Sequence, residues 1–402
     1  MTGASAGVGR AIALRFARAG ARLGLIARDA AALEEVKEEA ERLGGSAHVA
    51  AADVADADAV FAAADEIARQ LGPIEVWVND AMVTVFAPVW KITPEEFRRV
   101  TEVTYLGAVH GTFAALAHMR PRNRGTIIQI GSALAYRGIP LQAAYCGAKH
   151  ALRGFTNSLR SELIHAKSAI NLTIMELPAV NTPQFDWART HMPREPRPVP
   201  PVVEPEAIAD AAFRAALHPR REVWIGWSTL KVILGNMVLP AFLDRYLARA
   251  AFEAQETRVP VAPDRRDNLM TLVHDLHRTR GRFGSEASES TVVAPGPVAR
   301  LAPVFAGALV LFSLGLLARG RHRPRWIRRA HEGEKAAIRR ISNDLQAIND
   351  DGHANRAARL FRLDILLSCR IAPVSPGHFR QQNQLSVTAL RYRRKPARLY
   401  FR

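Results

Sequence analysis

Three residues near the middle of the chain have the types and the spacing that proton transfer requires. Tyr145 and Lys149 stand four positions apart in "YCGAK", so on a helix their side chains share one face. A lysine ammonium near a phenol stabilises the phenolate and lowers its pKa towards a value suited to a general acid or base. Ser132 ends an apolar run thirteen positions before Tyr145, where its hydroxyl would hold a substrate carbonyl. Together the three residues predict proton exchange with a carbonyl or alcohol oxygen.

The chain opens with a glycine-rich stretch, "TGASAGVG", which sets Gly3, Gly7 and Gly9 ahead of a helical pattern at 10–20. Glycines permit a tight turn and let a dinucleotide approach the backbone closely. The start of the following helix supplies N–H groups and a dipole for a pyrophosphate. The opening therefore predicts a dinucleotide-binding turn.

The residue at the end of the next apolar run bears on the choice of cofactor. An acidic residue there would accept hydrogen bonds from the ribose hydroxyls of NAD. This chain has Arg28 instead, and a guanidinium suits a 2′-phosphate. The position favours NADP(H), the alternative being that Arg28 is a solvated residue at a strand end.

Short apolar runs alternate with helical patterns from residue 2 to about residue 226, as βαβ units require. Strands are expected at 22–28, 47–54, 74–80, 125–132, 170–177 and 221–226, and helices at 31–44 and 59–72. This alternation predicts an α/β fold with a doubly wound parallel sheet that is covered on both faces. The proline-rich stretch 183–205 interrupts the pattern and is interpreted as a lid over a pocket.

Four regions follow from the composition along the chain. They are a dinucleotide-binding catalytic domain at 1–227, an extension at 228–298 with an apolar helix followed by loosely ordered chain, a candidate transmembrane helix at 300–319 and a basic tail at 320–402. Residues 301–318 carry no charge and just reach the length of a membrane span, the alternative being a buried helix. We expect membrane association through this segment, with the catalytic domain on the cytoplasmic face, or a cytoplasmic protein if the segment does not insert.

The net charge of +17 is concentrated in the tail, where residues 321–402 hold 19 Lys and Arg against 6 Asp and Glu. The rest of the chain is close to neutral, so nucleic-acid binding by the main body is not expected. Two cysteines are too few for a disulfide framework and favour a reducing compartment. His274 and His277 have a metal-like spacing without a third ligand, so they are interpreted as a surface pair and no metal site is expected.

The combination of these motifs resembles the short-chain dehydrogenase/reductase family over residues 2–226. The resemblance rests on "TGASAGVG", "ADV" at 52–54, "NDA" at 79–81, Ser132, "YCGAK" and "LPAVNT" at 177–182. It implies a Rossmann-like fold and hydride transfer between NADP(H) and a carbonyl/alcohol pair. Tyr145 would be the general acid/base, Ser132 would polarise the carbonyl, and Lys149 would hold the nicotinamide ribose and tune Tyr145. The cofactor-binding residues implied are Gly3, Ser5, Gly7, Val8, Gly9, Arg28, Asp53, Val54, Asn79, Ala81, Tyr145, Lys149, Pro178, Val180 and Thr182.

The chain departs from the family pattern at several points. "NDAM" replaces N-N-A-G, Pro178-Ala179 replaces Pro-Gly, and Thr104 stands where the family has a helix asparagine that holds a proton-relay water. Thr104 is therefore the fourth catalytic candidate. The apolar residues that form the central first strand in the family do not precede the turn, so we expect a sheet that lacks this strand and a chain that starts inside its fold.

Two functions remain open from the sequence. The first is an NADP(H)-dependent oxidoreductase for a small molecule, which the apolar stretch after residue 228 suggests is lipophilic, in an enzyme that the family resemblance suggests is a homo-oligomer. The second is a non-catalytic nucleotide-binding or membrane-anchored interaction protein, favoured by Thr104 and by the missing strand. Intact Ser132, Tyr145 and Lys149 favour the enzyme.

Overall fold

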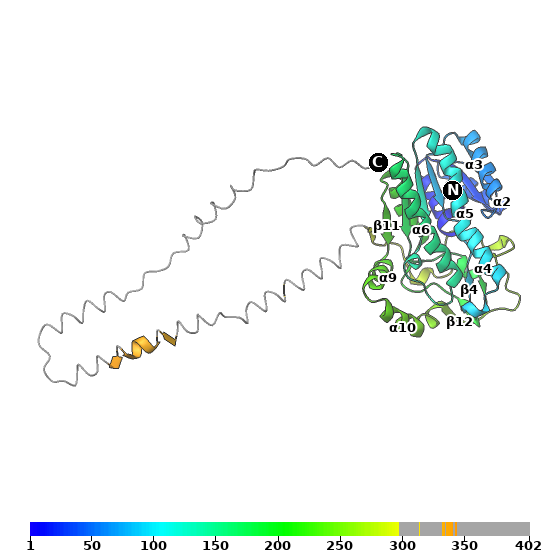
Figure 1. Ribbon diagram of the computed structural model, residues 1–402. Coiled ribbons are helices and arrows are strands. Elements are labelled where there is room, and N and C mark those ends of the chain that lie inside the picture. The colour runs from blue at the N-terminus through cyan, green and yellow to red at the C-terminus, as the bar shows by residue number, and fades with distance from the viewer. Residues whose placement is uncertain (297–312, 314–331, 334, 341, 344–402) are drawn as a thin grey trace, which may run out of the picture. The chain divides into compact units, whose positions relative to one another are not determined.

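The computed structural model describes residues 1–296, 313, 332–333, 335–340 and 342–343 (Figure 1). The chain divides into two compact units, Met1–Leu311 and Phe312–Arg402. Among the described residues of the second unit, 335–340 are helical and exposed. The fold described below is that of the first unit.

A mostly parallel sheet forms the centre of this unit. Its strands are β1 (Arg22–Ala27), β2 (Ser46–Ala51), β3 (Val76–Asn79), β5 (Thr126–Ile130), β6 (Asn171–Glu176), β11 (Glu222–Ile225) and β14 (Val293–Pro295). β2 pairs with β1, and the order β3-β5-β6-β11-β14 continues on the other side of Thr2, which bridges to both Ile26 and Asn79. All pairs are parallel except β11 with β14. The predicted doubly wound α/β sheet is confirmed.

Helices cover both faces of the sheet (Figure 1). One face packs against α1 (Gly7–Ala17), α2 (Ala30–Arg42) and α8 (Pro205–Leu217), and the other against α3 (Ala57–Leu71), α5 (Gly107–Met119) and α6 (Ala143–His165). α2 illustrates the cause, because Leu33 and Val36 are fully buried at helical spacing while the intervening glutamates are exposed or half-buried. Asp29 starts this helix by accepting a hydrogen bond from the Ala32 N–H at 3.1 Å.

The centre of the sheet, between β1 and β3, is held by the first residues of the chain. The Thr2 N–H donates to the Val78 carbonyl and the Ile26 N–H donates to the Met1 carbonyl, each at 2.9 Å. A cavity of about 260 Å³ lies beside Met1, lined by the starts of β1 and β3 and by Ile12, Phe16 and Ile67. Thr2 thus occupies the position that the sequence analysis assigned to the missing strand.

The extension after β11 forms α9 (Trp227–Val238), α10 (Pro240–Ala250), β12 (Glu256–Pro260), β13 (Ala287–Ser288) and β14. β12 pairs with β9 (Arg194–Pro196), β13 with β10 (Val202–Val203) and β14 with β11. Our expectation of loosely ordered chain after residue 255 was therefore wrong. Short strands at sheet edges are held by main-chain hydrogen bonds, which leave little hydrophobic periodicity in a sequence.

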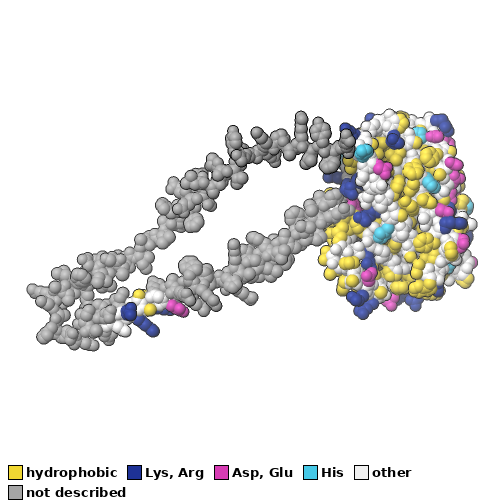
Figure 2. All heavy atoms as spheres, viewed as in Figure 1, with side chains coloured by type: hydrophobic (Ala, Val, Ile, Leu, Met, Phe, Trp, Pro, Cys, Tyr) yellow, Lys and Arg dark blue, Asp and Glu magenta, His cyan; other side chains and the backbone are white. Residues whose placement is uncertain are grey.

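Apolar side chains of α9 and α10 stay exposed on the surface. Trp227, Phe242 and Tyr246 are 61%, 60% and 55% exposed, and the last two rings stack at 6.3 Å. Figure 2 shows hydrophobic patches across this face of the unit. Among the residues described, no helix has both the length and the hydropathy to cross a membrane. The predicted span at 301–318 falls outside that part of the chain, apart from Ser313.

Candidate active site

The glycine turn between Thr2 and α1 has the geometry that the sequence predicts. Gly3 and Gly7 have positive φ angles of 73° and 57°. A Cβ on Gly9 would lie 2.1 Å from the Gly3 carbonyl oxygen, and one on Gly3 would lie 2.7 Å from the Ala81 nitrogen. Each of these three positions therefore requires glycine, for conformation or for space.

A cavity of about 170 Å³ lies against this turn. It is lined from the carboxyl ends of the strands by Gly3, Ser5, Gly7, Val8, Ala27, Arg28, Asp53, Val54, Asp80, Ala81 and Thr182, among others. α1 begins here at Ala6 without a side-chain cap, which leaves its first N–H groups to other acceptors. A glycine cradle, an uncapped helix start and an arginine at the next strand end fit the phosphates of a dinucleotide.

Arg28 and Asp53 stand at the ends of β1 and β2, on the cavity wall. Arg28 donates from Nη2 to the Asn268 carbonyl at 2.7 Å. Burial works to raise the pKa of Asp53, but the Ala55 N–H and the Arg99 guanidinium outweigh it and hold that pKa below its usual value. Asp53 therefore stays ionised beside two arginines, with its acceptor capacity partly used by the protein.

The three candidates for chemistry come together at the end of β5 and the start of α6. The Ser132 hydroxyl lies close enough to the Tyr145 phenol to lower its pKa, and the Lys149 Nζ lies 5.6 Å from the centre of the Tyr145 ring. Lys149 is 3% exposed and donates to the Ile130 carbonyl at 2.7 Å. The predicted grouping of these residues is present, although they do not line the cavity beside the glycine turn.

The expected lowering of the Tyr145 pKa is not what the structure shows. Burial raises this pKa above its usual value, helped by the nearby Asp80 and Glu176, while the Ser132 hydrogen bond opposes the rise. The Lys149 ammonium is committed to the Ile130 carbonyl, and burial lowers its own pKa to about 8. Tyr145 is thus held in its neutral form, which can donate a proton.

Two carboxyl groups lie around these candidates and were not assigned from the sequence. Burial raises the pKa of Asp80 to about 7, opposed by Lys149 and by a hydrogen bond from the Gly9 N–H. Burial and Glu222 raise the pKa of Glu176 to about 8, although Glu176 accepts the Ser132 N–H at 2.7 Å. The sequence signal for Asp80 was its place in "NDAM", whereas nothing local identified Glu176.

Thr104 and Asn79 act within the protein scaffold. Thr104 lies in a π-helical turn, Glu102–Leu106, and its hydroxyl donates to the Val83 carbonyl at 2.8 Å and accepts the Val83 N–H at 3.1 Å. Its role in holding a relay water stays a prediction. The Asn79 amide accepts from Trp77 and donates to Ala108, Thr112 and Gln129, so its side chain faces this buried network.

Several other assigned positions are also found away from the cavity. Gly9, Asn79, Pro178 and Val180 do not line it. Val180 is buried in β7 (Ala179–Val180), which pairs with β10, and Pro178 lies against Gly226. Their roles as cofactor contacts stay predictions.

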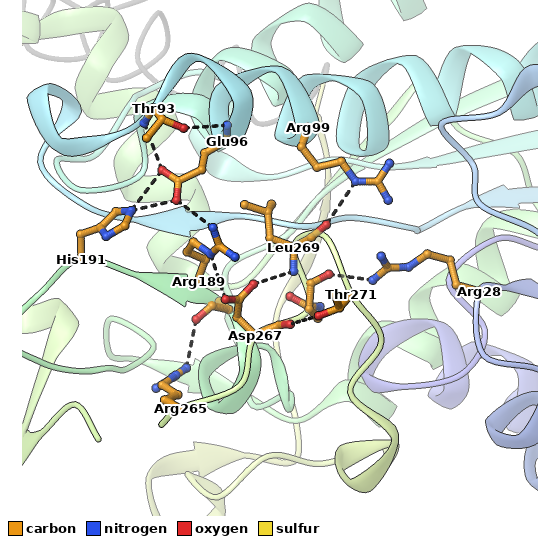
Figure 3. Close-up of polar contacts among 12 residues, drawn as sticks. Arg28, Thr93, Glu96, Arg99, Arg189, His191, Arg265, Asp267, Leu269 and Thr271 are labelled. Carbon is orange, nitrogen blue, oxygen red and sulfur yellow. Dashed lines mark hydrogen bonds and ion pairs between the residues drawn. The ribbon is translucent and has the colours of Figure 1, made fainter. Parts of the chain in front are cut away.

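The cavity also has lining residues that no motif indicated. Trp187 and Gln184 come from the proline-rich insert, and Asn268, Leu272, Val273 and His277 come from the extension. His274 and His277, interpreted as a surface pair, both contact the buried Asp29 carboxylate, at 2.6 and 3.2 Å. Figure 3 shows how Arg28 and Arg99 reach the extension near Leu269.

The family model for the short chain dehydrogenases matches residues 1–192. The chain belongs to the short-chain dehydrogenase/reductase family and is an oxidoreductase of that family, whose fold binds nicotinamide cofactors. An uncharacterised oxidoreductase of Bacillus subtilis, YxnA, is 29% identical over 311 residues, which is 75% of this chain and 87% of that protein.

Two further likenesses support the same assignment. A fatty acyl-CoA reductase of Acinetobacter baylyi is 32% identical over 224 residues, which is 55% of this chain and 73% of that protein. The structure of a short-chain dehydrogenase from Streptomyces avermitilis superimposes with a TM-score of 0.52 at 25% identity, over 62% of this chain and 97% of that one.

Proposed function

We propose that the protein is an NADP(H)-dependent oxidoreductase that interconverts a carbonyl and an alcohol on a lipophilic small molecule. The observation that carries this proposal is the grouping of Ser132, Tyr145 and Lys149 at the end of β5 and the start of α6, with the Lys149 ammonium 5.6 Å from the centre of the Tyr145 ring. In this arrangement the hydroxyl groups of Ser132 and Tyr145 can both reach one substrate oxygen, and the Lys149 ammonium lies near the Tyr145 ring.

In this proposal the chain's own residues manage the proton. Neutral Tyr145 donates its phenolic proton to the substrate oxygen during reduction, and takes one from the alcohol in the reverse direction. Ser132 donates a hydrogen bond to the same oxygen and stabilises its developing charge. Lys149 stabilises the phenolate that remains on Tyr145. The nicotinamide, when bound, supplies or accepts the hydride.

The preference for NADP(H) over NAD(H) rests on Arg28. Its guanidinium stands on the wall of the cavity at the end of β1, where a 2′-phosphate could accept from it. Gly3, Ser5, Gly7 and Val8 would hold the pyrophosphate, and Asp53 and Val54 would meet the adenine. Asp29, another carboxylate on that wall, is turned to two histidines.

Two observations support a lipophilic substrate. The apolar side chains of α9 and α10 are exposed, and these helices lie beside the segment that follows Ser132, where Arg137 contacts Asn236, Pro240 and Asp244. The relative in Acinetobacter baylyi is named for a fatty acyl-CoA substrate.

We also propose that the protein lies at the cytoplasmic face of a membrane, with residues 301–318 as the contact. Co-sedimentation of the full chain with lipid vesicles would test this.

Calorimetry and a turnover assay test the proposal on the full chain. We expect NADPH to bind more tightly than NADH, and NADPH oxidation with long-chain aldehydes or ketones to exceed that with short ones. Tyr145→Phe should bind NADPH as the unaltered protein does and lose turnover. Binding of NADPH without turnover of any carbonyl or alcohol would favour the second function, a non-catalytic nucleotide-binding protein, which the commitment of Thr104 to Val83 also suits.

A further inference from the structure

The extension returns across the cofactor cavity between β12 and β13. Residues 264–283, called here the roof segment, contribute Asn268, Leu272, Val273 and His277 to the lining of the cavity against which the glycine turn lies. The roof segment belongs to neither the family pattern nor the motifs of the sequence. Its position raises the question of how a dinucleotide reaches the turn.

Main-chain carbonyls of the roof segment occupy three donors around the cavity. The Gly7 N–H donates to the Arg278 carbonyl at 2.9 Å, Arg10 donates to the His277 carbonyl at 2.8 Å, and Arg28 donates to the Asn268 carbonyl at 2.7 Å. A helix-start N–H and two guanidinium groups are the donors that phosphate groups prefer. The carbonyls therefore occupy hydrogen-bond donors that the phosphates of a dinucleotide would need in order to bind.

Ion pairs anchor the near end of the roof segment to the domain (Figure 3). The buried Glu96 carboxylate accepts from Arg189 at 3.2 Å, and Arg189 reaches on to Asp267 at 2.9 Å. Asp267 also accepts the Leu269 N–H at 3.0 Å, which sets the direction of the carbonyls that Arg28 and Arg99 bind. These charge-assisted contacts hold the segment at 267–269.

A second anchor holds the far end. Asp186 pairs with Arg278 at 2.8 Å and with Arg282 at 3.1 Å, and the Gly281 N–H donates to the Asn181 carbonyl at 3.1 Å. Between the two anchors the chain is less enclosed. Met270 is 44% exposed and Leu272 is 39% exposed, although Leu272 also lines the cavity. Opening the middle of the roof segment would also release buried Val273 and the contacts of His274 and His277 with Asp29, whereas Met270 and Leu272 offer little resistance.

The enclosed space is small for the cofactor. Its volume of about 170 Å³ falls below the range of about 300–1,000 Å³ that small-molecule sites occupy. We propose that the roof segment is a gate of the cofactor site, which opens for a dinucleotide to enter or leave and exchanges its carbonyls for phosphates at Gly7, Arg10 and Arg28. This inference rests on the proposed function, because it assumes an NADP(H) site.

The gate is tested by loosening each anchor in the full chain and measuring NADPH binding by stopped flow. Trp187 lines the cavity and reports binding by energy transfer to NADPH. Asp267→Asn removes the ion pair to Arg189 at the near end, and Asp186→Asn removes the pairs at the far end. The control is Asp210→Asn, which deletes an exposed ion pair to Arg15 on the α1–α8 face.

We expect each anchor variant to raise both the association and the dissociation rate constant of NADPH by about tenfold, the effect of losing one charge-assisted hydrogen bond from the closed gate. The control should change neither. A rise in association with a fall in dissociation would be the effect of lost negative charge alone and would overturn the gate. Unchanged rate constants in both anchor variants would also overturn it.

The two variants guard against a folding failure in one of them, since the anchors share no residue. Failure of the gate is distinct from failure of the proposed function. If the unaltered protein binds neither NADPH nor NADH, the function is wrong. If it binds NADPH with rate constants that the anchor variants leave unchanged, the function stands and the gate does not exist.

Discussion

Two segments meet at the cofactor cavity, one from the start of the domain and one from its end. The glycine turn at Thr2–Gly9 is held by contact so close that a single Cβ on Gly9 would fall 2.1 Å from a carbonyl oxygen. The roof segment is held by ion pairs and by hydrogen bonds to its main chain, with exposed side chains along its middle. Steric fit fixes the first, whereas ion pairs and main-chain hydrogen bonds hold most of the second. The one close steric contact at a glycine of the roof segment is at Gly281, where a Cβ would lie 2.5 Å from the Thr182 carbonyl oxygen.

This difference predicts how each segment responds to change. Close packing tolerates no added atom and moves little, because its cost rises steeply with overlap. Partly exposed ion pairs each contribute little and are screened by salt, so a segment held by them can open. A rigid glycine turn beneath a roof segment that can open is suited to binding a cofactor tightly and still releasing it.

The largest effect is expected at Tyr145. Tyr145→Phe removes the proton that the substrate oxygen receives, and general acid catalysis contributes about 10²–10⁴-fold to a rate. Turnover should fall by that factor while the dissociation constant of NADPH stays unchanged in calorimetry. Asp210→Asn, which deletes the exposed ion pair to Arg15, is the control and should keep full turnover. Full turnover by Tyr145→Phe would exclude Tyr145 as the acid.

The next prediction compares the crowded Gly9 of the turn with Gly284, an uncrowded glycine that follows the roof segment. Gly9→Ala should destabilise the protein by about 3 kcal/mol, because its Cβ meets the Gly3 carbonyl at 2.1 Å and the Asp80 carboxylate at 2.8 Å. Gly284→Ala, just beyond the roof segment, places its Cβ at 3.6 Å from its nearest neighbour and should change stability by less than about 0.5 kcal/mol. Urea unfolding measures both. Equal effects would remove the contrast between the two positions.

A third prediction concerns Arg28, which stands at the end of β1 and donates to the Asn268 carbonyl of the roof segment. Arg28→Ala removes a donor to the 2′-phosphate, and a hydrogen bond to a charged group is worth about 1.5–3 kcal/mol. The affinity for NADPH should fall by about 10–100-fold while that for NADH is unchanged, as titration of both nucleotides would show. A parallel loss of both affinities would mean that Arg28 acts through the Asn268 carbonyl and the roof segment.

The sequence was sufficient to predict the glycine turn and the grouping of Ser132, Tyr145 and Lys149. Glycine at three spaced positions and a serine, tyrosine and lysine at fixed separations are side-chain requirements, so they leave a pattern. The doubly wound parallel sheet followed from the alternating apolar runs in the same way. The hydrogen-bond network of the Asn79 side chain was not predicted, because the family pattern does not tell that Trp77 and Gln129 would surround its amide.

The roof segment could not be predicted, and the reason is physical. Its contacts with Gly7, Arg10 and Arg28 use carbonyl groups, which every residue carries, so no residue type records them. Its anchors join positions nearly 80 residues apart or more, as Arg189 with Asp267 and Asp186 with Arg278 do. Ion pairs between residues so far apart cannot be predicted from the sequence of a segment that otherwise has the polar composition of a loop.

The last prediction concerns Asp80, a buried carboxyl group on the cavity wall that charge rather than shape controls. Its pKa is 3.8 in an unfolded chain and about 7 in the folded protein, so the native state binds more protons between these values. Stability should therefore decrease as the pH rises from about 4 to about 7. Asp80→Asn cannot ionise and escapes this loss, so its stability relative to the unaltered protein should be about 2–3 kcal/mol greater at pH 8 than at pH 5. Urea unfolding at the two pH values measures the difference, with Asp210→Asn as the exposed control. A pH-independent difference would show that Asp80 is ionised throughout, held so by Lys149, and that charge pairing governs this part of the cavity wall as it governs the roof segment.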